Sequence, residues 1–191
     1  MLFRSASLPN ETAMAADVTT AADLQRAFED GDRWLELVAG RLVRLSPPDE
    51  IHGNVVRNLS KALGKHFRKN PTLYPVFELG LVLSRDPDTV RCPAISCFSV
   101  GDGLAQSAQL VTDARPELIV EVASSNDRRE AMSDRIRDYQ HWGVPAIWVF
   151  DPVSQHAHVF HRDEAPRMLK ETELLHGKYE LAGLQIGRAH V

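Results

Sequence analysis

The sequence predicts an α/β (α+β) fold in which helices pack on a mixed sheet with a parallel pair of strands at its centre. A near-continuous apolar run at 118–123 is typical of a strand covered on both faces, and it is followed by a helical pattern and a second apolar run at 146–150. Strand, helix and strand in this order form a βαβ-like unit. The chain has 191 residues, 43% hydrophobic and 25% charged, which predicts one globular domain with a sizeable core.

Charge and composition exclude several classes of protein. The net charge of -4 provides no basic field for non-specific nucleic-acid binding, so any such binding must be local. Cys92 and Cys97 lie five apart in one predicted strand, where they would point to opposite faces, and neither a disulfide nor a zinc site is indicated. The longest apolar runs are far shorter than the roughly 20 residues that span a bilayer. With no membrane segment and no secretory signal in the sequence, we expect a cytoplasmic protein.

The two ends of the chain differ from its middle. Residues 1–17 are polar and small without periodicity, which predicts a disordered N-terminal extension. The last seven residues, QIGRAHV, read like a translated sequencing adapter, so we expect 185–191 to be a non-native tail that replaces the natural C-terminus. The folded domain is therefore predicted over 18–184, and neither end is expected to supply core residues.

The first predicted element is a short helix over 22–30. Leu24 and Phe28 stand four apart and would share one face of this helix. Thr19 or Thr20 provides its N-terminal cap.

A hairpin is predicted next. The apolar-rich runs WLELV and RLVRL flank Ala39 and Gly40, and glycine suits the positive φ of such a turn. Pro47 and Pro48 end the second strand.

A helix of about five turns is predicted over 51–69. Apolar residues recur every four positions: Ile51, Val55, Leu59, Leu63 and Phe67. Asp49 or Glu50 favours its N-terminus electrostatically. The outer face of the helix is basic, with Arg57, Lys61, Lys65 and Arg68.

Two further strands are predicted over 76–84 and 90–100. The residues between them, RDPDT, are typical of a turn, and a proline lies near the start of the second strand. We therefore expect a second hairpin.

The predicted helix that follows the central strand covers 127–142. Its apolar stripe consists of Met132, Ile136, Tyr139 and Trp142. Asp127 and Glu130 form a D-x-x-E start, and Gly143 marks the end. After the second apolar run, residues 156–162 are predicted to form an outer hairpin strand.

Glu121 is the strongest single indication of a functional site. A carboxylate inside a buried strand costs several kcal/mol unless it is paired or bound to a metal. Arg135 is its natural partner, since it lies beside the inward stripe of the following helix. Two alternatives stay open: the pair is purely structural, or Arg135 extends from the helix edge into solvent.

Other polar residues give weaker indications. Glu36 lies between two leucines in a predicted strand, and His52 opens a helix whose dipole disfavours imidazolium. The histidines at 156, 158 and 161 have no acidic residue or cysteine spaced to complete a metal site, so an exposed hairpin is preferred there. No nucleophile triad or phosphate-binding glycine loop is present in the sequence.

The order of these segments resembles a known family. LELVAGRLVRLSPP, His52 at a helix start, PDTVRCPAIS, PELIVEVASSNDR and RIRDYQHWGVPAIWVFDP together are similar to the "Uma two" family of restriction endonucleases, in the PD-(D/E)XK nuclease superfamily. The resemblance covers nearly all of 17–184. It implies a restriction-endonuclease-like mixed sheet flanked by helices and a metal-dependent endonuclease that acts on DNA.

The resemblance also implies roles for individual residues. Glu121 matches the metal-binding glutamate, Arg135 occupies the position of the catalytic lysine, and Glu36 and His52 match the accessory acid and histidine. Ala94 replaces the aspartate that would hold Mg2+ together with Glu121.

The two departures predict an impaired catalytic site. Mg2+ is usually held by one or two carboxylates, and alanine removes one of them. Arginine keeps the charge of lysine but stays protonated, so it cannot assist proton transfer. Three hypotheses follow: a weakened metal-dependent endonuclease, a non-catalytic protein that binds nucleic acid or a protein partner through the same cleft, or a purely structural βαβ scaffold. A homodimer is left open. Convergence of Glu36, Glu121, Arg135 and Ala94 on one cleft would discriminate between them.

Overall fold

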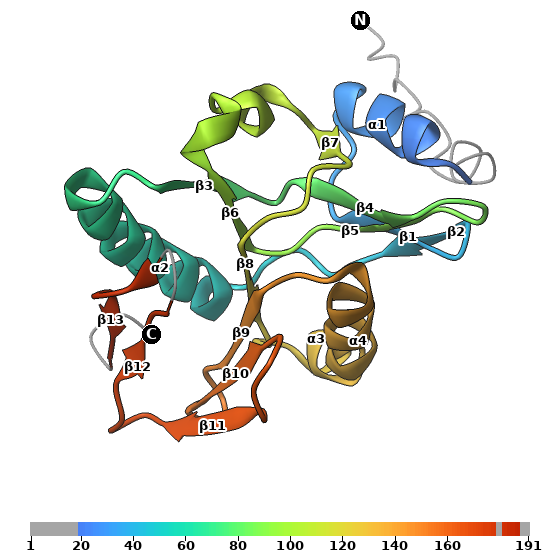
Figure 1. Ribbon diagram of the computed structural model, residues 1–191. Helices are drawn as coiled ribbons and strands as arrows, with labels where there is room; N and C mark the ends of the chain where they lie inside the picture. Colours follow the sequence, from blue (N-terminus) through green and yellow to red (C-terminus); the bar gives the residue numbers. More distant parts are fainter. Residues whose placement is uncertain (1–18, 179–180, 188–191) are drawn as a thin grey trace, which may run out of the picture.

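The computed structural model describes residues 19–178 and 181–187, which form two main sheets covered by helices (Figure 1). The five-stranded sheet has the order β2-β1-β5-β4-β7. Its strands are β1 (Leu35–Val38), β2 (Arg41–Arg44), β4 (Gly80–Ser84), β5 (Thr89–Arg91) and β7 (Val111–Thr112). The six-stranded sheet has the order β11-β10-β9-β8-β6-β3. Its strands are β3 (Leu73–Phe77), β6 (Ile95–Ser99), β8 (Leu118–Val122), β9 (Ala146–Asp151), β10 (His156–His161) and β11 (Arg167–Lys170).

The predicted βαβ unit is confirmed at the centre of the six-stranded sheet. Strands β8 and β9 are parallel neighbours, with Leu118 paired to Ala146 and Val122 paired to Phe150. Both strands are almost completely buried, because helices cover the sheet on both sides. The mixed α+β architecture predicted from the sequence is therefore correct.

The two faces of β8 pack against different helices. Leu118, Val120 and Val122 face a core that includes Val55, Leu59 and Leu63 of α2 (Glu50–Lys69). The intervening residues face α4 (Met132–Trp142), where Ile119 packs in a second core with Tyr139. Figure 1 shows α2 and α4 on opposite sides of the sheet. Because successive side chains of a strand alternate, every second residue of β8 points toward α4, and Glu121 is one of them.

The N-terminal elements agree with the predictions. Thr20 caps α1 (Ala21–Glu29) by accepting a hydrogen bond from the Asp23 amide, and Leu24 and Phe28 are buried against the five-stranded sheet. Ala39 and Gly40, both with positive φ, form the turn between β1 and β2. The side chain of Asp49 caps α2.

The second predicted hairpin is only partly correct. The residues predicted as one strand over 76–84 belong to β3 and β4, which lie in different sheets, and those predicted over 90–100 belong to β5 and β6, which also lie in different sheets. Strands β4 and β5 form the expected hairpin, whereas β3 pairs with β6. Within residues 76–100 the chain therefore crosses twice between the sheets, once near Glu78 and once at 92–94. Cys92 follows β5 and Cys97 lies in β6, so the expectation that both belong to one strand is wrong.

The helix predicted over 127–142 is divided in two. Helix α3 (Asn126–Glu130) and α4 are separated at Ala131, whose ψ of -10° departs from regular helical geometry. The predicted D-x-x-E start depends on the Asp127 side chain, which lies outside the described part of the structure. Gly143, with a φ of 85°, ends α4 as predicted.

Three smaller expectations need correction. Ile51 is exposed, so the apolar stripe of α2 begins at His52 and Val55. Strand β10 is not at the sheet edge, because β11 pairs along its outer side.

Ile186 in β13 (Gln185–Ile186) pairs with β12 (Leu175–His176) and is only 2% exposed, so the expectation that 185–191 supply no core residue is wrong at this position. The predicted extension at 1–17 lies outside the described residues.

Two 3-10 turns, η1 (Val100–Asp102) and η2 (Ala105–Ala108), lie in the connection between β6 and β7. Within the described part of the chain, no helix has the length and apolar character needed to cross a bilayer.

Candidate functional site

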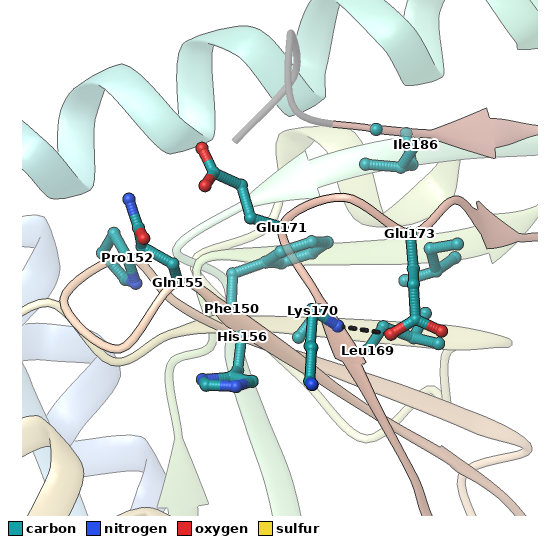
Figure 2. A pocket seen from close by; sticks show the side chains of 12 residues that line it. Phe150, Pro152, Gln155, His156, Leu169, Lys170, Glu171, Glu173 and Ile186 are labelled. Carbon is teal, nitrogen blue, oxygen red and sulfur yellow. Dashed lines mark hydrogen bonds between the residues drawn. The ribbon is translucent and has the colours of Figure 1, made fainter.

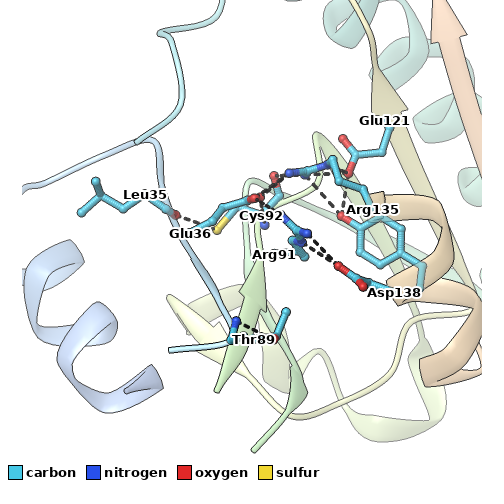
Figure 3. A network of polar contacts seen from close by, with 10 residues as sticks. Leu35, Glu36, Thr89, Arg91, Cys92, Glu121, Arg135 and Asp138 are labelled. Atoms are coloured by element: carbon cyan, nitrogen blue, oxygen red, sulfur yellow. Dashed lines mark hydrogen bonds and ion pairs between the residues drawn. The ribbon is translucent and has the colours of Figure 1, made fainter. Parts of the chain in front are cut away.

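A buried ion-pair network joins the two sheets to α4 (Figure 3). Glu36 comes from β1 in the five-stranded sheet, Glu121 from β8 in the six-stranded sheet, and Arg135 from the first turns of α4. The sequence predicted Arg135 as the partner of Glu121, and the structure shows that Arg135 pairs with both Glu121 and Glu36. Their side chains are at most 4% exposed.

Arg135 is the centre of this network because its guanidinium contacts both glutamates. Nε and Nη2 donate to Oε1 of Glu121 at 2.9 and 2.7 Å. Nη1 donates to both carboxylate oxygens of Glu36, at 2.7 and 2.6 Å. The planar fork of a guanidinium allows one side chain to contact two carboxylates that approach from different sheets.

Four other residues complete the network. The Tyr139 hydroxyl donates to Oε1 of Glu121 at 2.6 Å, and the Cys92 amide donates to Oε1 of Glu36 at 2.7 Å. Arg91 donates to Oε2 of Glu36 at 3.2 Å and to Oδ2 of Asp138 at 2.7 Å.

Arg91 and Asp138 were not predicted to contribute to the site, and Tyr139 was predicted only as part of the apolar stripe of its helix. Two of them could have been found by spacing, because Asp138 and Tyr139 lie three and four residues after Arg135 on the same side of the helix. Arg91 lies in β5, and only the tertiary fold brings it to Glu36.

The network places two guanidinium groups among three carboxylates in a region from which water is largely excluded. Burial raises the pKa of Glu36, but Arg135 and Arg91 outweigh this effect and the net pKa is lowered. Burial lowers the pKa of Arg135, but Glu121 and Glu36 raise it well above its ordinary value. Burial also raises the pKa of Tyr139, so its hydroxyl stays protonated and can donate to Glu121. The arrangement therefore stabilises the charged form of Glu36 beside a permanent cation.

Ala94 and His52 lie beside this network and are not members of it. The ladder between β6 and β8 begins with the pair Ile95 and Val120, and Ala94 directly precedes β6 at this end. Ala94 and His52 line one pocket together with Cys92, which itself contacts Glu36. The five residues identified from the sequence thus form a network and an adjoining pocket.

His52 is buried at the start of α2. Burial, together with the nearby Arg128 guanidinium, lowers its pKa to about 4, so the imidazole is neutral near pH 7. Its Nδ1 atom is buried and has no hydrogen-bond partner among the described residues. This atom can therefore form a hydrogen bond with a ligand or an ordered water in the adjoining pocket.

The donor atoms around Glu121 do not fit a tightly held divalent metal ion. Mg2+ requires oxygen ligands in octahedral geometry, usually one or two carboxylates and several waters. Both oxygens of Glu36 and one oxygen of Glu121 already accept hydrogen bonds from Arg135, and Ala94 in the adjoining pocket offers no side-chain ligand atom. No group of three or more His, Cys, Asp or Glu residues that could hold a metal occurs in the described ranges.

The C-terminal histidines lie elsewhere. His156 and His158 are on β10, and Figure 2 shows His156 beside a pocket whose apolar lining includes Phe150, Leu169 and Ile186. No residue of the ion-pair network lines this pocket. The expectation of an exposed hairpin is wrong, because His156 and His158 are half-buried and His161 is only 6% exposed. The preference against a metal site at these histidines stays a prediction.

The mixed sheets, their covering helices and the buried Glu121 define a restriction-endonuclease-like α+β protein. A solved structure from Anabaena variabilis ATCC 29413, described as a putative nuclease belonging to DUF820, superimposes with a TM-score of 0.68. The two chains are 15% identical, and the match covers 82% of this chain and 88% of the other. At this identity the likeness establishes the fold.

The family follows from the sequence profile. The profile of the Uma2 family, described as "Putative restriction endonuclease", matches residues 21–189, and the chain belongs to this family. The resemblance identified from the sequence is therefore confirmed. No curated protein matches the chain significantly.

Proposed function

We propose that this chain is a DNA-binding member of the Uma2 family whose central site does not hydrolyse phosphodiester bonds. The observation that carries the proposal is the position of Arg135, whose guanidinium donates to both Glu36 and Glu121. The guanidinium thus binds three of the four carboxylate oxygens of Glu36 and Glu121, which a nuclease of this kind would use for a metal ion.

The chemistry of the two replaced residues supports the proposal. Restriction-endonuclease-like proteins typically depend on a divalent metal, which orients the attacking water and neutralises the developing charge. Ala94 supplies no ligand for such an ion. A neutral lysine can exchange a proton with water, whereas a guanidinium stays protonated, and the contacts with Glu121 and Glu36 raise the pKa of Arg135 further.

Local positive charge supports DNA as the partner despite the net charge of -4. One exposed face of α2 carries a row of cations, Arg57, Lys61, Lys65 and Arg68, and none of them forms an ion pair within the described residues. At a rise of about 1.5 Å per residue this row follows the helix for roughly three turns, which suits contacts with successive phosphates.

A metal-dependent endonuclease is the second candidate, and one observation favours it. Oε2 of Glu121 accepts no hydrogen bond from any described residue, and Figure 3 shows this oxygen turned away from Arg135. It is the single carboxylate oxygen of the Glu36 and Glu121 pair that is available to a ligand.

A plasmid-nicking assay with Mg2+ or Mn2+ separates the two candidates. We expect no metal-dependent nicking by the unaltered chain, and nicking by the double variant Ala94→Asp with Arg135→Lys, since this variant regains a second carboxylate and a lysine. Cleavage by the unaltered chain that is lost in Glu121→Gln would refute the proposal and support the endonuclease.

DNA binding is measured in parallel by fluorescence anisotropy with the same unaltered protein. We expect the affinity for DNA to decrease as the salt concentration rises, because contacts with phosphates release counterions. If the protein binds no DNA and does not cleave it, a protein partner becomes the better interpretation of this surface.

A further inference from the structure

The pocket beside the ion-pair network lies where the chain crosses between the two sheets. Its lining comes from both crossings, with Phe77 and Glu78 from the first and Cys92 and Ala94 from the second. Its volume of about 200 Å3 is below the roughly 300 to 1,000 Å3 of pockets that enclose drug-sized ligands. A pocket of this size suits one planar ring system.

Two aromatic side chains on the wall of this pocket are open to solvent. Trp34 is 41% exposed and Phe77 is 44% exposed, although aromatic residues of this size are usually packed in a core. An exposed tryptophan in a concave site provides a flat apolar surface on which a second ring can stack.

The backbone at this pocket is held in unusual conformations. Trp34 has a φ of 56° and Glu78 has a φ of 51°, in the left-handed region that favours glycine. Such residues concentrate at binding sites, where the surrounding structure enforces them. Here they present a tryptophan ring and a carboxylate to the same pocket.

Polar groups of two kinds complete the pocket. The unpartnered Nδ1 of His52 is buried, and His52 lines the pocket, so it offers one hydrogen bond to the edge of a ligand. Arg33 and Arg128 also line the pocket. Arg33 donates hydrogen bonds to the backbone carbonyl groups of Phe28 and Asp32. Arg128 donates to the backbone carbonyl group of Ser46. Neither guanidinium has a carboxylate partner within the described part of the chain, so both are available to an anion.

We propose that this pocket binds one unpaired nucleobase of a nucleic-acid strand, with the base stacked on Trp34 and its phosphates held by Arg33 and Arg128. The base edge meets His52 and Glu78, which can exchange hydrogen bonds with ring nitrogens and amino groups. Ala94, where the family resemblance implies an aspartate, puts a methyl group on the pocket wall, which is more favourable for an apolar ring than a negative charge. This inference rests on the nucleic-acid binding proposed above. It adds that the protein prefers an unpaired base to a paired base.

The test compares probes that differ in their bases but not in their phosphate charge. Fluorescence anisotropy with the full chain measures affinity for a short oligothymidylate, for an abasic phosphate chain of the same length, for the matching oligouridylate, and for a duplex. We expect the base-bearing single strands to bind more tightly than the abasic chain and the duplex. Trp34→Ala should weaken binding of oligothymidylate about tenfold and leave binding of the abasic chain unchanged.

Two variants control for indirect effects. Trp34→Phe keeps an aromatic ring and should restore most of the affinity, whereas Met168→Ala, an exposed residue on β11 outside the pocket lining, should change nothing. Thermal unfolding of each variant verifies that it folds. A difference between the deoxy and ribo strands identifies which nucleic acid is preferred.

The inference fails if Trp34→Ala binds oligothymidylate as tightly as the unaltered chain, or if the abasic chain binds as tightly as the base-bearing one. Tight duplex binding without base dependence would refute this inference and leave the proposed function intact. Failure to bind any of the four probes would refute both.

Discussion

Replacement of Arg135 by leucine removes the cation at the centre of the buried network. The substitution removes the hydrogen bonds from the guanidinium to Glu36 and Glu121. Leucine has a helix propensity close to that of arginine, so the substitution should not disturb α4 by itself. Glu36 still has Arg91 and the Cys92 amide, but Glu121 is left with the Tyr139 hydroxyl as its partner in the described network.

The expected loss is about 3 to 5 kcal/mol of the free energy of unfolding at neutral pH, because one partner of a buried ion pair is removed and its carboxylate stays in the interior. The loss should also depend on pH. It should be smaller in acid than at neutral pH, because protonation removes the unpaired negative charge from the interior of the variant.

Urea unfolding followed by circular dichroism at several pH values measures both effects. Arg137→Leu is a matched control on the same helix, since Arg137 is 63% exposed and its ion pair with Asp134 lies on the surface. Its expected effect is below about 1 kcal/mol. A loss of less than 1 kcal/mol in Arg135→Leu, or a loss that does not change with pH, would show that the buried network does not stabilise the fold as argued.

Three other positions test separate parts of the structure. The pKa of His52 falls from 6.5 to about 4 on folding, so between these pH values the unfolded state binds more protons than the folded state. The free energy of unfolding should therefore decrease by about 3 kcal/mol as the pH falls from 6.5 to 4. In His52→Gln, urea unfolding should show a smaller decrease over the same pH range. Ile186→Ala should lower the free energy of unfolding by about 2 kcal/mol, a small loss for a buried isoleucine because β13 is a short strand. An unchanged melting temperature would contradict the packing of β13. Lys61→Ala should reduce the slope of DNA affinity against salt by about 1, and an unchanged slope would exclude a phosphate contact at this position of α2.

The sequence was sufficient to predict the central part of the fold. The run at 118–123 is apolar because both faces of β8 are covered, and the period of the following helix reflects one buried face. Local signals of this kind also predicted the cap at Thr20, the turn at Ala39 and the end of α4 at Gly143. Each depends on a few consecutive residues, so each can be found without knowledge of the tertiary structure.

The crossings between the sheets could not be predicted in the same way. An apolar run such as 76–84 has the same sequence pattern whether it forms one strand or two strands that diverge at a residue of positive φ. Here that residue is Glu78, and because it is not glycine the sequence gives no sign of the break. The burial of Glu36 was also unexpected from local pattern, because a glutamate between leucines in a strand is more often at the surface. Its partners, Arg91 and Arg135, are 55 and 99 residues away in the chain.

The residues at positions 135 and 94 are linked by the same electrostatics. Arg135 pairs with two carboxylates that approach it from different sheets, and within the described residues Oε1 is the one oxygen of Glu121 that accepts its hydrogen bonds. Position 94 is only 5% exposed and lines the pocket that adjoins the network, so an aspartate there would add another buried negative charge. Without a metal ion to neutralise it, that charge is costly, and alanine avoids the cost. An arginine that pairs with both glutamates is therefore compatible with alanine at position 94, which adds no charge to the lining that it shares with Trp34 and His52.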